Sequence, residues 1–530
     1  MSVAPPPTPP ETAALPADLT GRKQFVGNVL MSWLTQAVTI AAGFVMPRLI
    51  DRNLGQELLG VWDFSWSIVA YFALAQVGIT GSINRYVARY RAAGNDAAIN
   101  GAISSVFCVL LVMAGLVVAV ATGIGLWALP HYGTAKLGAH LADAQWVIIL
   151  LGLEIAVETL FSSFGGVLTG CHCWKRYYGI QTVTNIITVL GMAGAILLGG
   201  SLRVVALVHL LGVVGCWSAI TFNAYRVLPS LKVRPALATR ALAGEMFSFG
   251  AKSFLPQMGE LLLNQTVNVL VLVHLGPAAL ALYSRPRSLV QQIRTLVARM
   301  SGILIPSVSS IHATGDLAQI REVILKGTRY GAFLTLPVAL VVAAMGGPIL
   351  YLWMGPNYQS DVIPIALSAG TTAMIILTPA LCVLVGMNLH GTAGRIHFVG
   401  CAVTAASVWI ALGWFKVGLA GAAICAGLPL CLLYTFYMPC YLARHVNLSV
   451  SSFVIGGMGG PMLVCLPLLL CLLLSRWFFV GNPLLALLVG CSTGGATLLP
   501  LYWRFAMPES LKTKVRHWSG FGSRSKSALA

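Results

Sequence analysis

Charged residues are scarce in this chain. Asp, Glu, Lys and Arg together make up 9% of the 530 residues, and only 15 residues are acidic. The mean hydropathy of +0.83 is typical of a polytopic membrane protein and excludes an ordinary soluble globule. The polar loops between apolar runs are too short to hold a soluble catalytic domain, which argues against an enzyme. The nearest catalytic candidates share one loop: His131, His140 and Asp143.

Paired cysteine spacings are also lacking. The 12 cysteines are scattered through apolar runs, so we interpret them as small core residues and not as a disulfide framework. The run Cys171-His172-Cys173 is too tightly spaced to close a tetrahedral zinc site. We therefore predict neither a metal site nor a cofactor.

Basic residues exceed acidic ones, and the formal net charge is +18. Nucleic acid is not the expected partner, because the cations lie in short loops and not in one soluble module. With the amino terminus inside, the cytoplasmic segments carry 22 Lys and Arg, and the outer loops carry 6. This bias predicts an integral protein of the cytoplasmic (inner) membrane with both termini in the cytoplasm.

Long apolar runs predict an all-α polytopic membrane protein. A run of about 20 apolar residues spans a bilayer, and the sequence contains about fourteen of them. They lie near residues 25–49, 60–83, 99–128, 144–169, 179–199, 203–224, 247–274, 283–307, 329–353, 362–386, 396–415, 418–440, 453–475 and 483–504. The first run is too long for the core of a signal peptide.

The chain repeats itself at a shift of 221 residues. Segment 54–99 aligned on 275–320 without a gap gives 11 identities in 46 positions, including Gly55 on Gly276 and Gly94 on Gly315. Since the shift spans six helices, an even number, the repeat is parallel, with a pseudo-twofold axis along the membrane normal. We expect two six-helix bundles followed by two further helices.

The domain boundaries follow from this repeat and from the composition. We expect a disordered cytoplasmic tail (1–22), an N-terminal six-helix bundle (23–226), a cytoplasmic linker (227–245), a C-terminal six-helix bundle (246–445), helices 13 and 14 (446–506) and a basic cytoplasmic tail (507–530).

The eighth run is the most unusual, because it carries four arginines: Arg285, Arg287, Arg294 and Arg299. An arginine near the centre of a membrane helix costs roughly 3 kcal/mol, so these side chains must meet water, protein or a ligand. At helical spacing the apolar residues occupy one face and the arginines the other. The cationic face is expected to meet a polar and anionic group.

Several patterns resemble a known superfamily. They are PRLI at 47–50, NLGQELLG at 53–60, RYVARY at 85–90 and, in the second half, Leu275-Gly276, Tyr283-Ser284, Pro306 and Gly315-Asp316. The chain is similar to the polysaccharide and oligosaccharide-lipid flippases of the multidrug/oligosaccharidyl-lipid/polysaccharide exporter superfamily. The resemblance implies two bundles around a V-shaped cavity, with helices 1, 2, 7 and 8 at a lateral portal, and alternating access for a lipid-linked sugar.

Polar residues on those four helices are the candidate ligands. Besides the four arginines, the candidate substrate-binding residues are Lys252, Asn264, Asn28, Gln36 and Arg48. Together they would make a net cationic cavity that suits an anionic group. The alternatives are structural: Asn and Gln often tie membrane helices together, Arg285 and Arg299 can snorkel to the interface, and Arg48 can anchor there.

Acidic residues inside the expected helices are candidates for ion coupling. Glu154 and Glu158 lie four residues apart on one helix face, where they either take part in proton coupling or pair with basic residues. Glu260 and Asp63 are the other candidates, and Glu260 could also balance Lys252 and the arginines.

The favoured function is a flippase for a polyprenyl-diphosphate-linked oligosaccharide in polysaccharide biosynthesis. Its expected partners are that glycan, membrane lipid and polysaccharide assembly enzymes. A multidrug or cation antiporter of the same fold is the alternative, and it would need an acidic cavity. A membrane polysaccharide polymerase or ligase is the third hypothesis.

Overall fold

The computed structural model describes residues 22–76, 79–239, 254–302 and 304–507, together with Gly244, Glu509, Lys512 and Thr513. These residues are almost entirely helical, and none of them forms a strand. The expected all-α class is therefore confirmed. Contacts between Cα atoms divide the chain into two compact units, one of Met1–Met46, Ala75–Ile124 and Trp146–Ser253 and one of Pro47–Leu74, Gly125–Gln145 and Phe254–Ala530.

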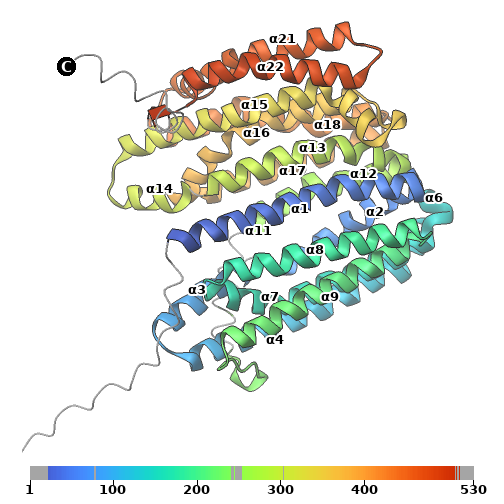
Figure 1. The fold of residues 1–530 in the computed structure, drawn as a ribbon, viewed down its shortest axis with the longest axis vertical. Coiled ribbons are helices and arrows are strands. Elements are labelled where there is room, and N and C mark those ends of the chain that lie inside the picture. The colour runs from blue at the N-terminus through green and yellow to red at the C-terminus, as the bar shows by residue number, and fades with distance from the viewer. Residues whose placement is uncertain are drawn as a thin grey trace, which may run out of the picture. The chain divides into compact units, whose positions relative to one another are not determined.

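The first unit is a helical bundle whose core lies between its helices. It contains most of α1 (Arg22–Leu54), then α3 (Ile79–Ala92), α4 (Asp96–Gly123), most of α7 (Leu141–Gly170), α8 (Trp174–Leu197), α9 (Leu202–Val227) and η4 (Pro235–Leu237). Helices α8 and α9 run side by side (Figure 1). The buried core gathers apolar side chains of α3, α4, α7 and α9, such as Ile83, Ile103 and Leu168.

The second unit begins with short elements that precede its long helices. These are the end of α1 from Pro47, α2 (Gln56–Val69), most of η1 (Ala70–Gln76), η2 (Ile124–Ala128), α5 (Leu129–Tyr132), α6 (Thr134–Leu137) and η3 (Gly138–His140). The next helices carry the candidate site: α11 (Phe254–Leu261), η5 (Leu262–Thr266), α12 (Val267–Leu275) and α13 (Pro277–Gly302).

The rest of the second unit consists of α14 (Leu304–Ala313), α15 (Leu317–Met354), η6 (Pro356–Tyr358), α16 (Val362–Gly386), α17 (His390–Gly413), α18 (Leu419–Leu432), η7 (Leu433–Tyr437), α19 (Met438–His445), α20 (Val450–Val454), η8 (Ile455–Gly459), α21 (Gly460–Phe478) and α22 (Pro483–Phe505). Helices α21 and α22 pack on each other and on α15 (Figure 1). The two appended helices of the sequence prediction therefore cover α15.

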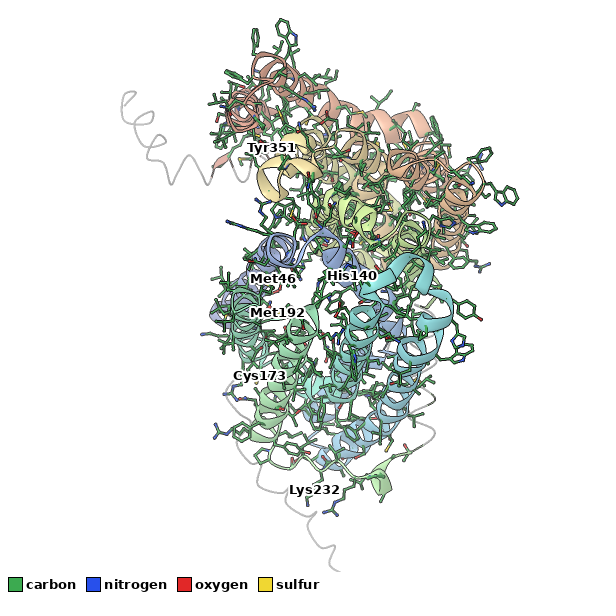
Figure 2. All side chains as sticks on the ribbon, turned by 90° about the vertical axis from the view of Figure 1, so that its right-hand side faces the viewer. Met46, His140, Cys173, Met192, Lys232 and Tyr351 are labelled. Carbon is green, nitrogen blue, oxygen red and sulfur yellow. The ribbon has the colours of Figure 1, made fainter. Side chains whose placement is uncertain are left out.

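Twelve helices of the described residues are long and apolar enough to cross a membrane, and the bent pair α13–α14 would make 13. Their outer surfaces carry mostly carbon (Figure 2), with exposed Leu, Val and Trp side chains that suit a hydrocarbon solvent. The expected second span, 60–83, is divided among α2, η1 and α3 and does not count among the twelve. The number fourteen stays a prediction.

Local backbone geometry agrees with the repeat at a shift of 221. Gly55 joins α1 to α2 with φ 100° and ψ 162°, and Gly276 joins α12 to α13 with φ 93° and ψ 174°. This region of backbone space is essentially accessible only to glycine. The same glycine joint therefore occurs at equivalent positions of the two halves.

A second pair of equivalent turns has matching caps. The side chain of Asn95 accepts a hydrogen bond from the backbone N–H of Ala98 at 2.9 Å, and Asp316 accepts one from Gln319 at 2.9 Å. Each cap satisfies a free N–H group at the start of a long helix. These pairs are again 221 residues apart, whereas the pseudo-twofold arrangement of whole bundles stays a prediction.

Helices α2 and α13 pack against each other in the second unit. Gln56 donates a hydrogen bond to the backbone oxygen of Ala278, and Arg285 donates to Asp63. Both pairs are 222 residues apart. Two helices with a constant offset between bonded residues run in the same direction, so α2 and α13 are parallel neighbours.

Candidate functional site

The candidate site lies in the second unit, where α13 faces the broken helix α11–η5–α12. On α13, Arg287 and Arg294 are seven residues apart and share a face. On the facing helix, Glu260, Asn264 and Asn268 follow one another at intervals of four residues, and the segment Leu262–Thr266 is π-helical. A π segment inside an α-helix is frequent at functional sites.

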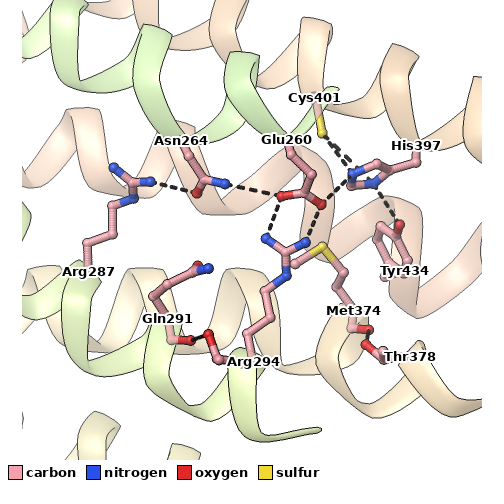
Figure 3. A network of polar contacts seen from close by, with 11 residues as sticks. Glu260, Asn264, Arg287, Gln291, Arg294, Met374, Thr378, His397, Cys401 and Tyr434 are labelled. Carbon is pink, nitrogen blue, oxygen red and sulfur yellow. Dashed lines mark hydrogen bonds and ion pairs between the residues drawn. The ribbon is translucent and has the colours of Figure 1, made fainter. Parts of the chain in front are cut away.

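Glu260 is the centre of a polar network (Figure 3). Both of its carboxylate oxygens accept hydrogen bonds from Arg294 in a forked ion pair. It also accepts from the side-chain nitrogen of Asn264 at 3.1 Å and contacts Nε2 of His397 at 2.9 Å. The sequence prediction that Glu260 or Asn264 faces the arginines is confirmed for the contact itself.

His397 extends this network to two more helices. It lies on α17, is 8% exposed, and its Nδ1 is 2.8 Å from the hydroxyl of Tyr434 in η7. The sulfur of Cys401 lies 3.5 Å from the same ring. The sequence analysis missed His397 and Tyr434, because a single histidine or tyrosine in an apolar run carries no periodic signal.

Arg287 differs from the other arginines of α13 in its partners (Figure 3). Its guanidinium donates to the amide oxygens of Asn264 and Asn268, each at 2.6 Å. Asn268 in turn donates to the hydroxyl of Ser67 on α2 at 2.9 Å. No carboxylate among the described residues forms an ion pair with Arg287, so its positive charge is held by neutral groups.

Arg285 has a carboxylate partner. It forms an ion pair with Asp63 of α2, and the two side chains are 6% and 14% exposed. With Glu260 paired to Arg294, two of the three half-buried or buried arginines are neutralised. The expected cationic character is therefore concentrated at Arg287.

A cavity of about 290 Å³ opens beside these groups. Its walls come from α2, η5, α12 and α13, and its lining is mainly polar: Asp63, Trp66, Ser67, Gln265, Asn268, Ser284, Arg285, Arg287, Ser288 and Gln291. Arg287 also lines a second, smaller space of about 40 Å³ with Asn264 and Arg294. Arg287 is therefore accessible from both sides of its amide contacts.

The remaining predicted substrate residues lie elsewhere or have other partners. In the first unit, Asn28 accepts a hydrogen bond from the backbone N–H of Lys175 at 3.0 Å, and Gln36 is half-buried. In the second unit, Arg48 donates to the backbone oxygen of Met354, and Arg299 is exposed. Lys252 lies outside the described residues. A role in substrate binding stays a prediction for all of them.

The two glutamates of α7 belong to the first unit. Glu154 is 3% exposed, and its carboxylate is 2.7 Å from Nδ1 of His209 on α9. Glu158, one turn later, is half-buried. Glu154 thus has the basic partner of the structural interpretation, and the coupling role of either residue stays a prediction.

Metal ligands do not cluster in the described part of the chain. The segment Cys171–Cys173 forms a turn between α7 and α8, in which Arg91 donates to the backbone oxygen of Cys171 at 2.9 Å. Burial raises the pKa of the Cys171 thiol. A thiol that stays protonated is a poor metal ligand, which agrees with the sequence interpretation of this turn.

Known proteins share both sequence and fold with this chain. Residues 102–363 match a family described as polysaccharide biosynthesis protein. The "Uncharacterized membrane protein EpsK" of Bacillus subtilis (strain 168) is 22% identical over 419 residues, which are 78% of this chain and 82% of the relative. The "Putative O-antigen transporter" of Shigella flexneri is 23% identical over 339 residues, 62% of this chain and 78% of the relative.

Solved structures show the same fold. The lipid II flippase MurJ in an inward closed conformation superposes with a TM-score of 0.66 at 14% identity, covering 90% of this chain and all of that chain (100%). An inward-facing multidrug resistance MATE transporter of the MOP superfamily gives 0.65 at 12% identity, covering 80% and 98%. The chain belongs to the multidrug/oligosaccharidyl-lipid/polysaccharide exporter superfamily, within its polysaccharide biosynthesis branch.

Proposed function

We propose that this protein is a flippase that moves a polyprenyl-diphosphate-linked oligosaccharide across the cytoplasmic membrane by alternating access, with both termini in the cytoplasm. The names of the relatives support transport in polysaccharide biosynthesis, since those that state an activity are a transporter and a flippase. The charge bias of the loops supports the orientation.

The arrangement around Arg287 carries the proposal. A diphosphate cannot cross hydrocarbon with its charge, so a flippase must offer it fixed cations in place of water. Arg287 offers a full positive charge that no carboxylate of the described residues neutralises, and the oxygens of Asn264 and Asn268 hold it in place. The guanidinium is therefore positioned in advance for an anion.

A phosphate can replace the amides as the acceptor. Hydrogen bonds from arginine to an ionised oxygen are roughly twice as strong as those to a neutral one, and the planar fork binds two phosphate oxygens at once. Returning to Asn264 and Asn268 after release keeps the empty site satisfied. Binding in exchange for existing hydrogen bonds is modest, which suits a carrier that must release its cargo.

The antiporter hypothesis fits the same contacts less well. A cationic substrate needs a free carboxylate, yet Asp63 and Glu260 are each bound to an arginine. A cation would have to displace a guanidinium from either one. We therefore favour an anionic substrate.

The test is a flipping assay in proteoliposomes with a polyprenyl-diphosphate-linked oligosaccharide. We expect Arg287→Ala to reduce the transbilayer rate at least tenfold at equal protein content, and Arg287→Lys to retain part of it, because lysine keeps the charge without the fork. Arg329→Ala is the matched control, since this exposed arginine of α15 donates only to the backbone of Gly456.

Wild-type rates in Arg287→Ala would overturn the assignment. A cationic-drug exporter gives a different result: loss of positive charge at Arg287 would leave drug efflux unchanged or increase it.

A further inference from the structure

Beside Arg287, the 290 Å³ cavity contains polar groups that the arginine contacts leave unused. The amides of Gln265 and Gln291 make no side-chain hydrogen bond with other described residues, although both line the cavity. Arg285 is 5% exposed, and its buried Nε–H has no hydrogen-bond partner in the described structure. A buried donor left unsatisfied costs about 1–3 kcal/mol, so a polar ligand in this cavity gains by meeting it.

These groups have the chemistry of a sugar site. A sugar ring presents neutral hydroxyls that both donate and accept, and amides and serine hydroxyls serve both roles. Trp66 adds an indole to the same wall, together with Ser67 and Ser288. Aromatic faces suit the C–H surface of a ring, whereas a purely anionic ligand would need neither the indole nor the amides.

We propose that this cavity is a subsite for one sugar ring, the one directly attached to the diphosphate. This inference rests on the proposed function, because it places the diphosphate at Arg287. The cavity volume lies at the lower end of the roughly 300–1,000 Å³ of small-molecule sites. It therefore accepts a single ring and leaves the rest of a glycan outside.

The direction of the sugar follows from the two spaces that meet at Arg287. The space beside Asn264 and Arg294 measures only about 40 Å³ and is lined mostly by apolar side chains such as Leu367 and Met374. The space toward α2 measures about 290 Å³ and contains the free amides. A ligand with its phosphate at Arg287 consequently directs its sugar toward Trp66.

The experiment compares binding of two kinds of probe to the purified full chain in nanodiscs. One is polyprenyl diphosphate without a sugar, and the other is a panel of polyprenyl diphosphates that each carry one sugar, namely N-acetylglucosamine, glucose or galactose. We expect at least one sugar-bearing probe to bind the wild type about tenfold more tightly than the bare diphosphate. Gln265→Ala and Trp66→Ala should remove that difference and leave binding of the bare diphosphate unchanged.

Two further variants keep the result interpretable. Trp66→Phe retains a smaller aromatic face and should keep part of the preference, which guards against misfolding of the alanine variant. Gln257→Ala is the control, since this glutamine lies on α11 outside the cavity lining, and it should bind every probe as the wild type does.

The outcomes separate this inference from the proposed function. Equal binding of the bare and all sugar-bearing probes, with both weakened by Arg287→Ala, would overturn the sugar subsite and leave the diphosphate site standing. A preference that survives both Gln265→Ala and Trp66→Ala would also overturn the subsite. If Arg287→Ala changed the binding of no probe, the proposed function itself would fail.

Discussion

Asp63 and Arg285 form a nearly buried ion pair that joins α2 to α13. Removing one partner of such a pair leaves an uncompensated charge, which typically costs 3–5 kcal/mol. We therefore predict that Arg285→Ala lowers the free energy of unfolding by about that amount, and that adding Asp63→Ala restores most of it. Unfolding in mixed detergent and SDS micelles measures both.

The exposed pair Glu322–Lys326 is the control for this cycle, because its side chains are 59% and 60% exposed. Lys326→Ala should leave the unfolding midpoint nearly unchanged. If Arg285→Ala unfolded at the wild-type midpoint, the pair would have no structural weight.

A carboxylate placed opposite Arg287 should abolish anion binding without unfolding the protein. Asn268 accepts from Arg287 at 2.6 Å, and Asn268→Asp would convert that neutral contact into an ion pair. We predict at least a tenfold loss of affinity for polyprenyl diphosphate, with an unfolding midpoint equal to or above that of the wild type. Asn268→Ser, which adds no charge, should bind more tightly than Asn268→Asp; the reverse order would refute the role of net charge.

Glu260 and Arg294 should behave as one energetic unit. Because both arginine nitrogens bond the same carboxylate, the single variants Glu260→Gln and Arg294→Gln should each destabilise the protein. The double variant should be more stable than the sum of the two effects by about 0.5–3 kcal/mol. Strict additivity in a double-mutant cycle would show that the pair contributes no coupling. The variant His397→Ala tests whether the coupling depends on the third contact of Glu260.

The two glycine joints should respond alike to substitution. Gly55 and Gly276 have φ of 100° and 93°, and a residue with a Cβ atom in that region costs on the order of 1–3 kcal/mol. We predict similar losses of unfolding free energy for Gly55→Ala and Gly276→Ala, measured by denaturation in micelles. Gly43→Ala is the control, because this glycine lies within α1 and an added Cβ atom would meet nothing within 4 Å. A loss at only one joint would argue against their equivalence.

Helical spacing predicted the faces of the site but not its pairing. The positions of Arg287 and Arg294 on one face, and of Glu260, Asn264 and Asn268 on another, follow from a period of 3.6 residues. Which amide meets which guanidinium depends on the rotation and height of two helices, and no single helix contains that information. The sequence therefore described the site as broadly cationic, whereas the structure leaves one unneutralised cation.

The same limit explains the second expected span and Asn28. Counting apolar residues adds up hydropathy without regard to the direction of the backbone, so residues 60–83 were expected as one helix and are divided among three elements. Asn28 was grouped with the cavity because it lies on the polar arc of its helix. Its oxygen instead accepts the N–H of Lys175 at the start of α8, a tie between helices that the alternative interpretation had included.

The parallel pairing of α2 with α13 has a consequence for the origin of the cavity. At a shift of 221 residues, Trp66 corresponds to Arg287, and both side chains line the same cavity. Neighbouring helices related by a twofold axis place equivalent positions opposite each other. If the two halves descend from one duplicated segment, a single ancestral position has become an aromatic surface in one copy and a cation in the other. A symmetric pocket would bind a ligand in two opposite orientations with equal affinity, whereas this divergence leaves room for only one.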